Sequence, residues 1–293
     1  MNPTHEKNVF KQNYYKVALL LSVSGLNGCS TLLNSATQDF SGHLKQTIMD
    51  HNDPATVTDA LPAYLLMMEA STAGDNASEN QLLSTAQFYC AYLSLLPEDV
   101  MRKQRLSQRS LDLALRGACL HDDSWCGLQQ KSFAELEALL VQTDADDIDR
   151  LYSVSSTWAT WIQANKNDWN AVAQLAQVKR IMQRVLELDE SYQQGNAHLY
   201  LAVMESLIPE GLGGKPDQSK QHFERAMQLA PNNLMIKVLY AKHYARMAFD
   251  RDLHDNLLKT VLTTQATSPG LTLINTLAQQ QAQPLLDSAN DYF

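Results

Sequence analysis

Cysteine and histidine are the residue types in this sequence that are best suited to chemistry. Cys119 and Cys126 are close in sequence, and a disulfide between them would close a short loop. The alternative is a metal set of Cys119, His121 and Cys126, which lacks a fourth ligand at a recognisable spacing. Cys90 occurs at helical spacing with apolar neighbours, which indicates a small buried side chain. We therefore favour the disulfide, and we expect neither a metal nor a cofactor.

The sequence contains no recognisable set of catalytic residues. Gly-x-Ser-x-Gly, His-Glu-x-x-His and Walker patterns are absent. The glycine-rich stretch 211–215 ends in Lys215, but Pro216 follows where a phosphate loop needs Ser or Thr. His198, His222, His243 and His254 lie on separate predicted helices, where surface or groove positions are the favoured interpretation. The sequence therefore does not predict an enzyme.

The N-terminus has the features of an export signal. Three lysines in residues 1–16 precede a short apolar run at 17–26, which is well below the roughly 20 residues that a membrane-spanning helix needs. Leu26-Asn27-Gly28-Cys29 follows and resembles the bacterial lipoprotein box, in which the cysteine is acylated. Residues 1–28 are predicted to be a signal peptide, Cys29 the lipidation site and 29–38 a tether. The alternative is a buried cysteine at the start of an ordinary helix.

The residue after Cys29 indicates which membrane the protein would be anchored to. Ser30 stands where an aspartate would resemble an inner-membrane retention signal. This favours the outer membrane, with the protein on its periplasmic face and held through an acyl anchor. The oxidising periplasm would also permit a disulfide.

Composition and charge narrow the class of protein. The chain has 293 residues, 45% of them hydrophobic, with 23 Lys and Arg against 32 Asp and Glu, so the net charge is −9. An acidic chain without a basic run argues against nucleic-acid binding, because phosphate contacts supply much of that affinity. Alternating strand patterns are nearly absent, whereas apolar residues recur at helical spacing.

Helix–turn–helix units follow one another along the chain. The clearest unit is 195–233, in which two helical stretches flank a segment rich in glycine and proline. We predict an all-α fold, a TPR-like helical-hairpin array (an α-α superhelix), as one domain over 39–293. The expected helices are 39–51, 56–71, 79–96, 99–120, 128–142, 148–164, 174–188, 195–208, 217–230, 234–249, 252–263 and 271–288.

An internal repeat supports this array. Residues 179–189 overlay 220–230 at an offset of 41, with Lys on Lys and Arg184 on Arg225. Residues 257–262 overlay 224–229 less well, but 261–262 fall on 226–227 at an offset of 35. A tetratricopeptide (TPR) repeat has a period of about 34 residues, and the longer offset is explained by the insertion at 209–215.

The aromatic residues of the second half allow two interpretations. Trp158 and Trp161 are three residues apart, and Tyr240 and Tyr244 are four apart, so each pair shares a helix face. The favoured interpretation is that they fill the interfaces between helices. The alternative is a partner or ligand groove suited to a peptide or a small organic acid. Its candidate residues are Trp158, Trp161, Asn165, His198, Tyr200, Tyr240, His243, Tyr244 and Arg246.

Several motifs together resemble one family. They are the lipobox, Trp158-Ala-Thr-Trp161, Leu186-Glu-Leu-Asp189, Gly211-Leu-Gly-Gly-Lys-Pro216, His222-Phe-Glu-Arg-Ala226, Leu239-Tyr-Ala-Lys-His-Tyr-Ala245, Asp250-Arg-Asp-Leu253 and Leu257-Leu258. These motifs and their order along the chain are similar to those of the T component of TRAP transporters (TatT). The resemblance implies a periplasmic TPR lipoprotein that docks the transporter's substrate-binding subunit and forms oligomers. It implies no catalytic residues. A ligand-binding or ligand-conducting protein, and a TPR scaffold for envelope assembly unrelated to transport, remain open alternatives.

Overall fold

The structure is a computed structural model that describes residues 43–74, 76–96, 99–207 and 214–293. Every regular element in these ranges is a helix, which confirms the all-α prediction. The chain divides into residues 1–50 and 51–293. Of the first unit the structure describes 43–50, helical from 43 to 49. The predicted signal peptide, Cys29 and the tether lie outside the described residues, so these boundaries stay predictions.

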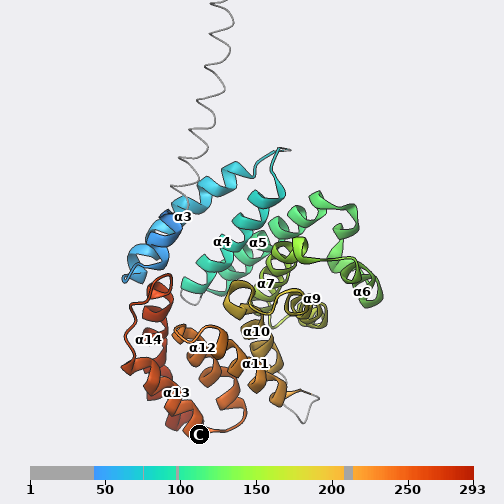
Figure 1. Cartoon of the computed structure of the whole chain (residues 1–293). Coiled ribbons are helices and arrows are strands. Elements are labelled where there is room, and N and C mark those ends of the chain that lie inside the picture. Colours follow the sequence, from blue (N-terminus) through green and yellow to red (C-terminus); the bar gives the residue numbers. More distant parts are fainter. Residues whose placement is uncertain (1–42, 75, 97–98, 208–213) are drawn as a thin grey trace, which may run out of the picture. The chain divides into compact units, whose positions relative to one another are not determined.

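Residues 51–293 form a succession of helices that pack on one another along the chain, with some shorter helices outside the main series (Figure 1). α4 packs on α5, α5 on α7, and α7 on α9, and the series continues through α10 and α11. α3 contacts both α4 and α14, so the two ends of this helical array meet. The elements are α3 (Pro54–Ser71), α4 (Glu79–Leu95), α5 (Val100–His121), η1 (Asp123–Trp125), η2 (Leu128–Gln130), α6 (Phe133–Val141), η3 (Ala145–Asp147), α7 (Ile148–Ala164), α8 (Trp169–Val172), α9 (Leu175–Leu188), α10 (Tyr192–Glu205), α11 (Pro216–Leu229), α12 (Leu234–Leu239), η5 (Tyr240–Ala245), α13 (Arg251–Thr263), α14 (Thr272–Asp287) and α15 (Ala289–Tyr292).

The prediction of one helix over 128–142 is wrong. The 3-10 turn η2 ends at Gln130, and α6 begins only at Phe133. Ser132 starts α6 through a capping box: its hydroxyl accepts from the Glu135 N–H at 3.3 Å, and the Glu135 carboxylate accepts from the Ser132 N–H at 2.7 Å. Because this exchange satisfies two backbone donors that a helix start leaves open, it fixes the boundary.

The internal repeat is visible in the helix boundaries. α11 begins and ends 41 residues after α9, which agrees with the first overlay, and α13 begins 35 and ends 34 residues after α11. The matched arginines also behave alike. Arg184 donates to Glu187 at 3.0 Å, and Arg225 donates to Gln228, 41 positions after Glu187, at 3.0 Å. The repeat thus preserves contacts as well as apolar spacing.

Different sets of helices contribute separate core regions. One is built from α4 to α10 and contains the buried side chains of Leu111, Leu140 and Trp158. A second, formed by α12, α13 and α14, is mainly aliphatic. α10 and α11 lie in close contact at Gly195, where an added Cβ would lie 2.3 Å from Leu229 Cδ1. Gly195 also has φ +72°, in the left-handed region that favours glycine.

Candidate functional site

The tryptophan pair of α7 is divided between the core and an accessible edge. Trp158 is fully buried, and its indole N–H donates to Gln174 Oε1 at 2.8 Å. Trp161 is half-buried, and its indole N–H donates to Gln108 Oε1 on α5 at 2.6 Å. Asn165 caps the helix by donating from Nδ2 to the Trp161 carbonyl at 2.9 Å. The favoured core interpretation therefore describes Trp158, while Trp161 keeps an exposed edge.

A tyrosine cluster lies where α7 meets α10. The ring of Tyr200 meets that of Tyr152 edge-on, with centroids 6.2 Å apart, and Asn196 donates to the Tyr152 hydroxyl at 2.5 Å. Burial raises the pKa of Tyr200 well above its usual value, and burial likewise raises the pKa of Tyr152. Both phenols therefore stay neutral, and the hydroxyl groups take part in hydrogen bonds without carrying charge.

A pair of histidines links α10 to α11. His198 Nδ1 lies 2.7 Å from His222 Nδ1, and His198 Nε2 lies 3.0 Å from Glu190 Oε1. Arg225 donates to both oxygens of Glu190, and this bond lowers the Glu190 pKa to about 2. Since that carboxylate can only accept, His198 carries its hydrogen on Nε2 and accepts at Nδ1 from His222.

Burial keeps both rings of this pair uncharged near neutral pH. It lowers the pKa of His198, and it lowers the pKa of His222 to about 4. The nearby Glu205 carboxylate is itself buried and forms an ion pair with Lys179 at 2.5 Å, so its negative charge is compensated. The network therefore connects α9, α10 and α11 through polar contacts.

Three of the predicted groove residues lie on a π-helix. η5 carries Tyr240, His243 and Tyr244, and π-helical turns occur frequently at functional sites. Tyr240 is buried and stacks on Phe223 with centroids 4.7 Å apart, whereas Tyr244 and His243 are half-buried. Burial lowers the pKa of His243 to about 4, so this ring is also neutral. The wider turn brings these aromatic side chains together along one segment.

Arg246 belongs to a different contact from the other candidates. Its guanidinium lies 4.9 Å from the centre of the Tyr292 ring, and its Nη2 donates to the Leu285 carbonyl at 3.3 Å and to Ser288 Oγ at 3.1 Å. Arg246 thus holds the C-terminal helices against η5. The nine candidates therefore do not form one site: they lie in the core at Trp158, at the edge of α7 with Tyr200, at the histidine pair, on η5 and at the C-terminal contact.

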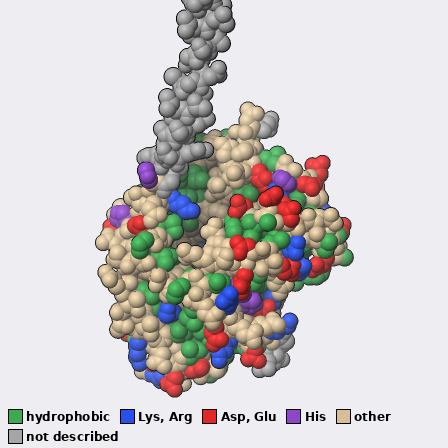
Figure 2. All heavy atoms as spheres, viewed as in Figure 1, with side chains coloured by type: hydrophobic (Ala, Val, Ile, Leu, Met, Phe, Trp, Pro, Cys, Tyr) green, Lys and Arg blue, Asp and Glu red, His purple; other side chains and the backbone are tan. Residues whose placement is uncertain are grey.

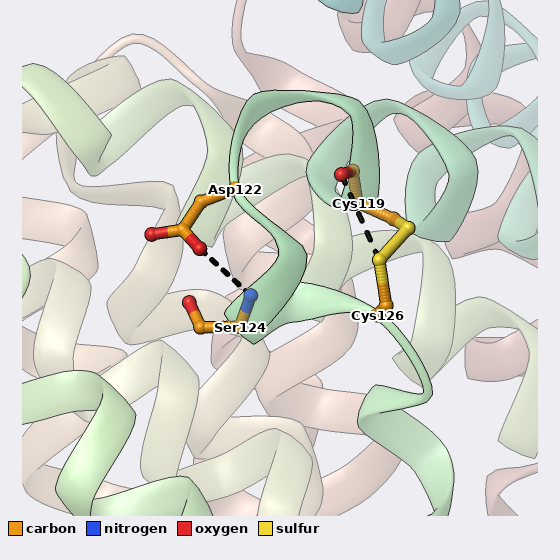
Figure 3. Close-up of a disulfide and its surroundings, with 4 residues drawn as sticks. All are labelled: Cys119, Asp122, Ser124 and Cys126. Carbon is orange, nitrogen blue, oxygen red and sulfur yellow. Dashed lines mark hydrogen bonds between the residues drawn. A yellow bond between two sulfur atoms is a disulfide. The ribbon is translucent and has the colours of Figure 1, made fainter.

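A disulfide joins Cys119, in the last turn of α5, to Cys126 in the turn that follows (Figure 3). The turn inside it is ordered by Asp122, whose Oδ1 accepts from the Ser124 N–H at 2.7 Å. Trp125 in the same turn is buried, so the loop is anchored in the core. Both sulfurs are bonded to each other, and no group of three metal-ligating side chains occurs in the described ranges. Cys90 is a free, half-buried cysteine.

Sequence reasoning missed the polar partners of the candidates. Gln108 is 53 positions from Trp161, and Glu190, which contacts His198, is held by Arg225 from 35 positions away, so neither long-range contact has a local signal. On the face that Figure 2 shows, Asp and Glu side chains are interspersed with Lys, Arg and apolar side chains.

The model of the family described as TRAP transporter T-component matches residues 50–293. No curated protein matches the chain. In the part of the chain that the structure describes, no helix combines the length and apolarity needed to cross a membrane.

Proposed function

Because the chain belongs to the TRAP transporter T-component family, we propose that it docks the substrate-binding subunit of a TRAP-type transporter from the periplasmic face of the outer membrane. The family match over residues 50–293 carries this proposal, and it describes a transporter component rather than an enzyme. The helical-hairpin array supports it, since such arrays use extended surfaces to bind partners. Acylation of Cys29 supplies the membrane anchor in this proposal.

We place the docking surface at the edge of α5 and α7, around Trp161 and Gln108. Tryptophan residues with an apolar ring and a satisfied N–H are frequent anchors of protein interfaces. Trp161 has this form, because its ring is half-buried while its N–H bonds to the exposed Gln108. Binding of a small solute is a second part of the proposed function.

The docking experiment compares two tryptophans. Trp161→Ala should weaken binding of the purified substrate-binding subunit by about 10-fold or more, the effect of losing an interface anchor. Trp169→Ala is the matched control, because Trp169 is 85% exposed on α8 and lies outside the proposed surface. Binding is measured by surface plasmon resonance, with the protein captured on lipid through its own anchor.

A second variant separates binding from folding. Gln108→Lys changes the exposed rim without removing apolar core, so its melting temperature should stay close to that of the wild type while binding weakens. Equal binding by the wild type, Trp161→Ala and Gln108→Lys would place the partner elsewhere. Absence of any binding by the wild type would refute docking altogether.

The anchor has its own test. Radiolabelled palmitate should label the wild type and should not label Cys29→Ser, while Cys90→Ser keeps the label. Labelled protein should fractionate with outer membranes. Labelling of Cys29→Ser, or none in the wild type, would contradict the proposed lipoprotein.

A further inference from the structure

A cavity of about 360 Å³ lies at the junction of two interhelical turns, away from the docking surface proposed above. One turn joins α11 to α12 at 230–233, and the other joins α13 to α14 at 264–271. α12 and α14 pack against each other and bring the two turns together (Figure 1). The volume is near the lower end of the roughly 300–1,000 Å³ of ligand pockets, which suits a small molecule.

One buried side chain fixes both walls of this cavity. Asn275 on α14 is 1% exposed; its Oδ1 accepts from the Leu234 N–H at 2.9 Å. Its Nδ2 donates to the Asn232 carbonyl at 3.0 Å and to the Ala266 carbonyl at 3.1 Å. Because the side-chain amide of Asn275 hydrogen-bonds to both turns, the distance between the turns is fixed before a ligand binds. Less conformational entropy is therefore lost on binding.

Lys237 contributes a positive charge to the cavity. It lies one turn into α12, is half-buried, and has no carboxylate within ion-pairing distance among the described residues. By contrast, Lys179 and Lys259 each have a carboxylate partner. Burial lowers the pKa of Lys237, as expected for an ammonium group that has lost water without gaining a counter-ion. A bound anion would supply that missing charge.

The wall formed by the second turn is rich in hydrogen-bonding groups. Thr264, Thr267 and Ser268 bring hydroxyl groups, and Gln265 brings an amide. The Thr264 hydroxyl donates to the Thr260 carbonyl at 2.7 Å, which leaves its oxygen able to accept. Such groups can both donate to and accept from the hydroxyl groups of a ligand.

We propose that this cavity binds a small carboxylate that carries several hydroxyl groups, with its carboxylate at Lys237 and its hydroxyls at Thr264, Thr267 and Ser268. The inference deepens the solute-binding part of the proposed function and rests on it. It needs no substrate-binding subunit, so its outcome is read on the purified chain alone. Failure here would leave the docking result standing, and failure of docking would leave this site standing.

The test uses three probes: gluconate has both features, sorbitol has only hydroxyls, and hexanoate has only the carboxylate. Isothermal titration calorimetry should show gluconate binding at least about 10-fold tighter than sorbitol or hexanoate, a difference of about 1.4 kcal/mol. Lys237→Met should weaken gluconate by a similar factor. Lys259→Met is the matched control, since that lysine lies on α13 beside Asp255 and should leave binding unchanged.

A second, more conservative variant tests the site in case Lys237→Met fails to fold. Thr267→Val keeps the shape of an exposed residue and removes one hydroxyl, so it should weaken gluconate and leave hexanoate unchanged. Equal gluconate affinity in the wild type and Lys237→Met would overturn the site. So would the absence of binding by the wild type at millimolar gluconate, or equal binding of gluconate and sorbitol.

Discussion

Replacing Gly195 by alanine tests the close approach of α10 to α11. Two costs arise. An L residue held at φ +72° loses about 1–2 kcal/mol through contact of Cβ with its own backbone. The added Cβ would also lie 2.3 Å from Cδ1 and 2.9 Å from Cβ of Leu229, and crowding of this kind costs about 1–3 kcal/mol. Together, Gly195→Ala should lower the free energy of unfolding by about 2–5 kcal/mol.

Gly74 provides the matched control for this change. It has φ +82°, but a Cβ there would meet nothing within 4 Å. Gly74→Ala should therefore lose only the conformational part, about 1–2 kcal/mol. Urea unfolding followed by circular dichroism measures both variants, with the slope of free energy against urea as a check that unfolding stays two-state.

A double-mutant cycle with Leu229→Ala isolates the contact itself. That substitution removes Cγ and Cδ1 of Leu229. The double variant should therefore lose about 1 kcal/mol less unfolding free energy than the two single variants lose in total. Equal losses for Gly195→Ala and Gly74→Ala, or simple additivity with Leu229→Ala, would refute the claim that α10 and α11 touch at Gly195.

Three further outcomes are expected. Cys126→Ser opens a disulfide loop of sequence separation 7 and should cost about 2 kcal/mol, measured by urea unfolding against the wild type with and without reductant; an unchanged midpoint would contradict it. The pKa of His222 is lowered from 6.5 to about 4, so as the pH falls the unfolded chain binds a proton at His222 before the folded chain does. The contribution of neutral His222 to the free energy of unfolding is therefore complete above pH 6.5 and is lost as the pH falls towards 4. His222→Gln should therefore flatten the fall in stability between pH 7 and about pH 5, and an unchanged slope would reject the assignment. Trp158→Ala should cost about 3–5 kcal/mol because the ring is fully buried, and a loss near zero in thermal unfolding would show that it is not.

The helices could be predicted because their signals are local. Apolar spacing set the bodies of α7 and α9 within a residue, and the offset of 41 between repeats holds at both ends of α9 and α11. One signal was available and was overlooked: Ser132 and Glu135 form a capping box in the middle of an expected helix. Phe133 therefore begins a new helix.

The candidate site was predictable only in part, because it depends on contacts between distant segments. Spacing placed Trp158 and Trp161 on one helix, but the packing of α5 and α9 decides which ring is buried. The π-helix at Tyr240–Ala245 has no pattern in the sequence that distinguishes it from an α-helix. The bond between His198 and His222 arises from the antiparallel pairing of α10 and α11, which spacing alone does not specify.

The contact between α3 and α14 has a consequence for how the protein comes apart. An open stack of repeats can fray from either end, since each unit depends only on its neighbours. Here α3 and α14 contact each other, so each has a packing partner far away in the sequence in addition to its own neighbours. Clipping the chain at one terminus should therefore loosen the opposite one, and hydrogen exchange in α14 would report a cut made in α3.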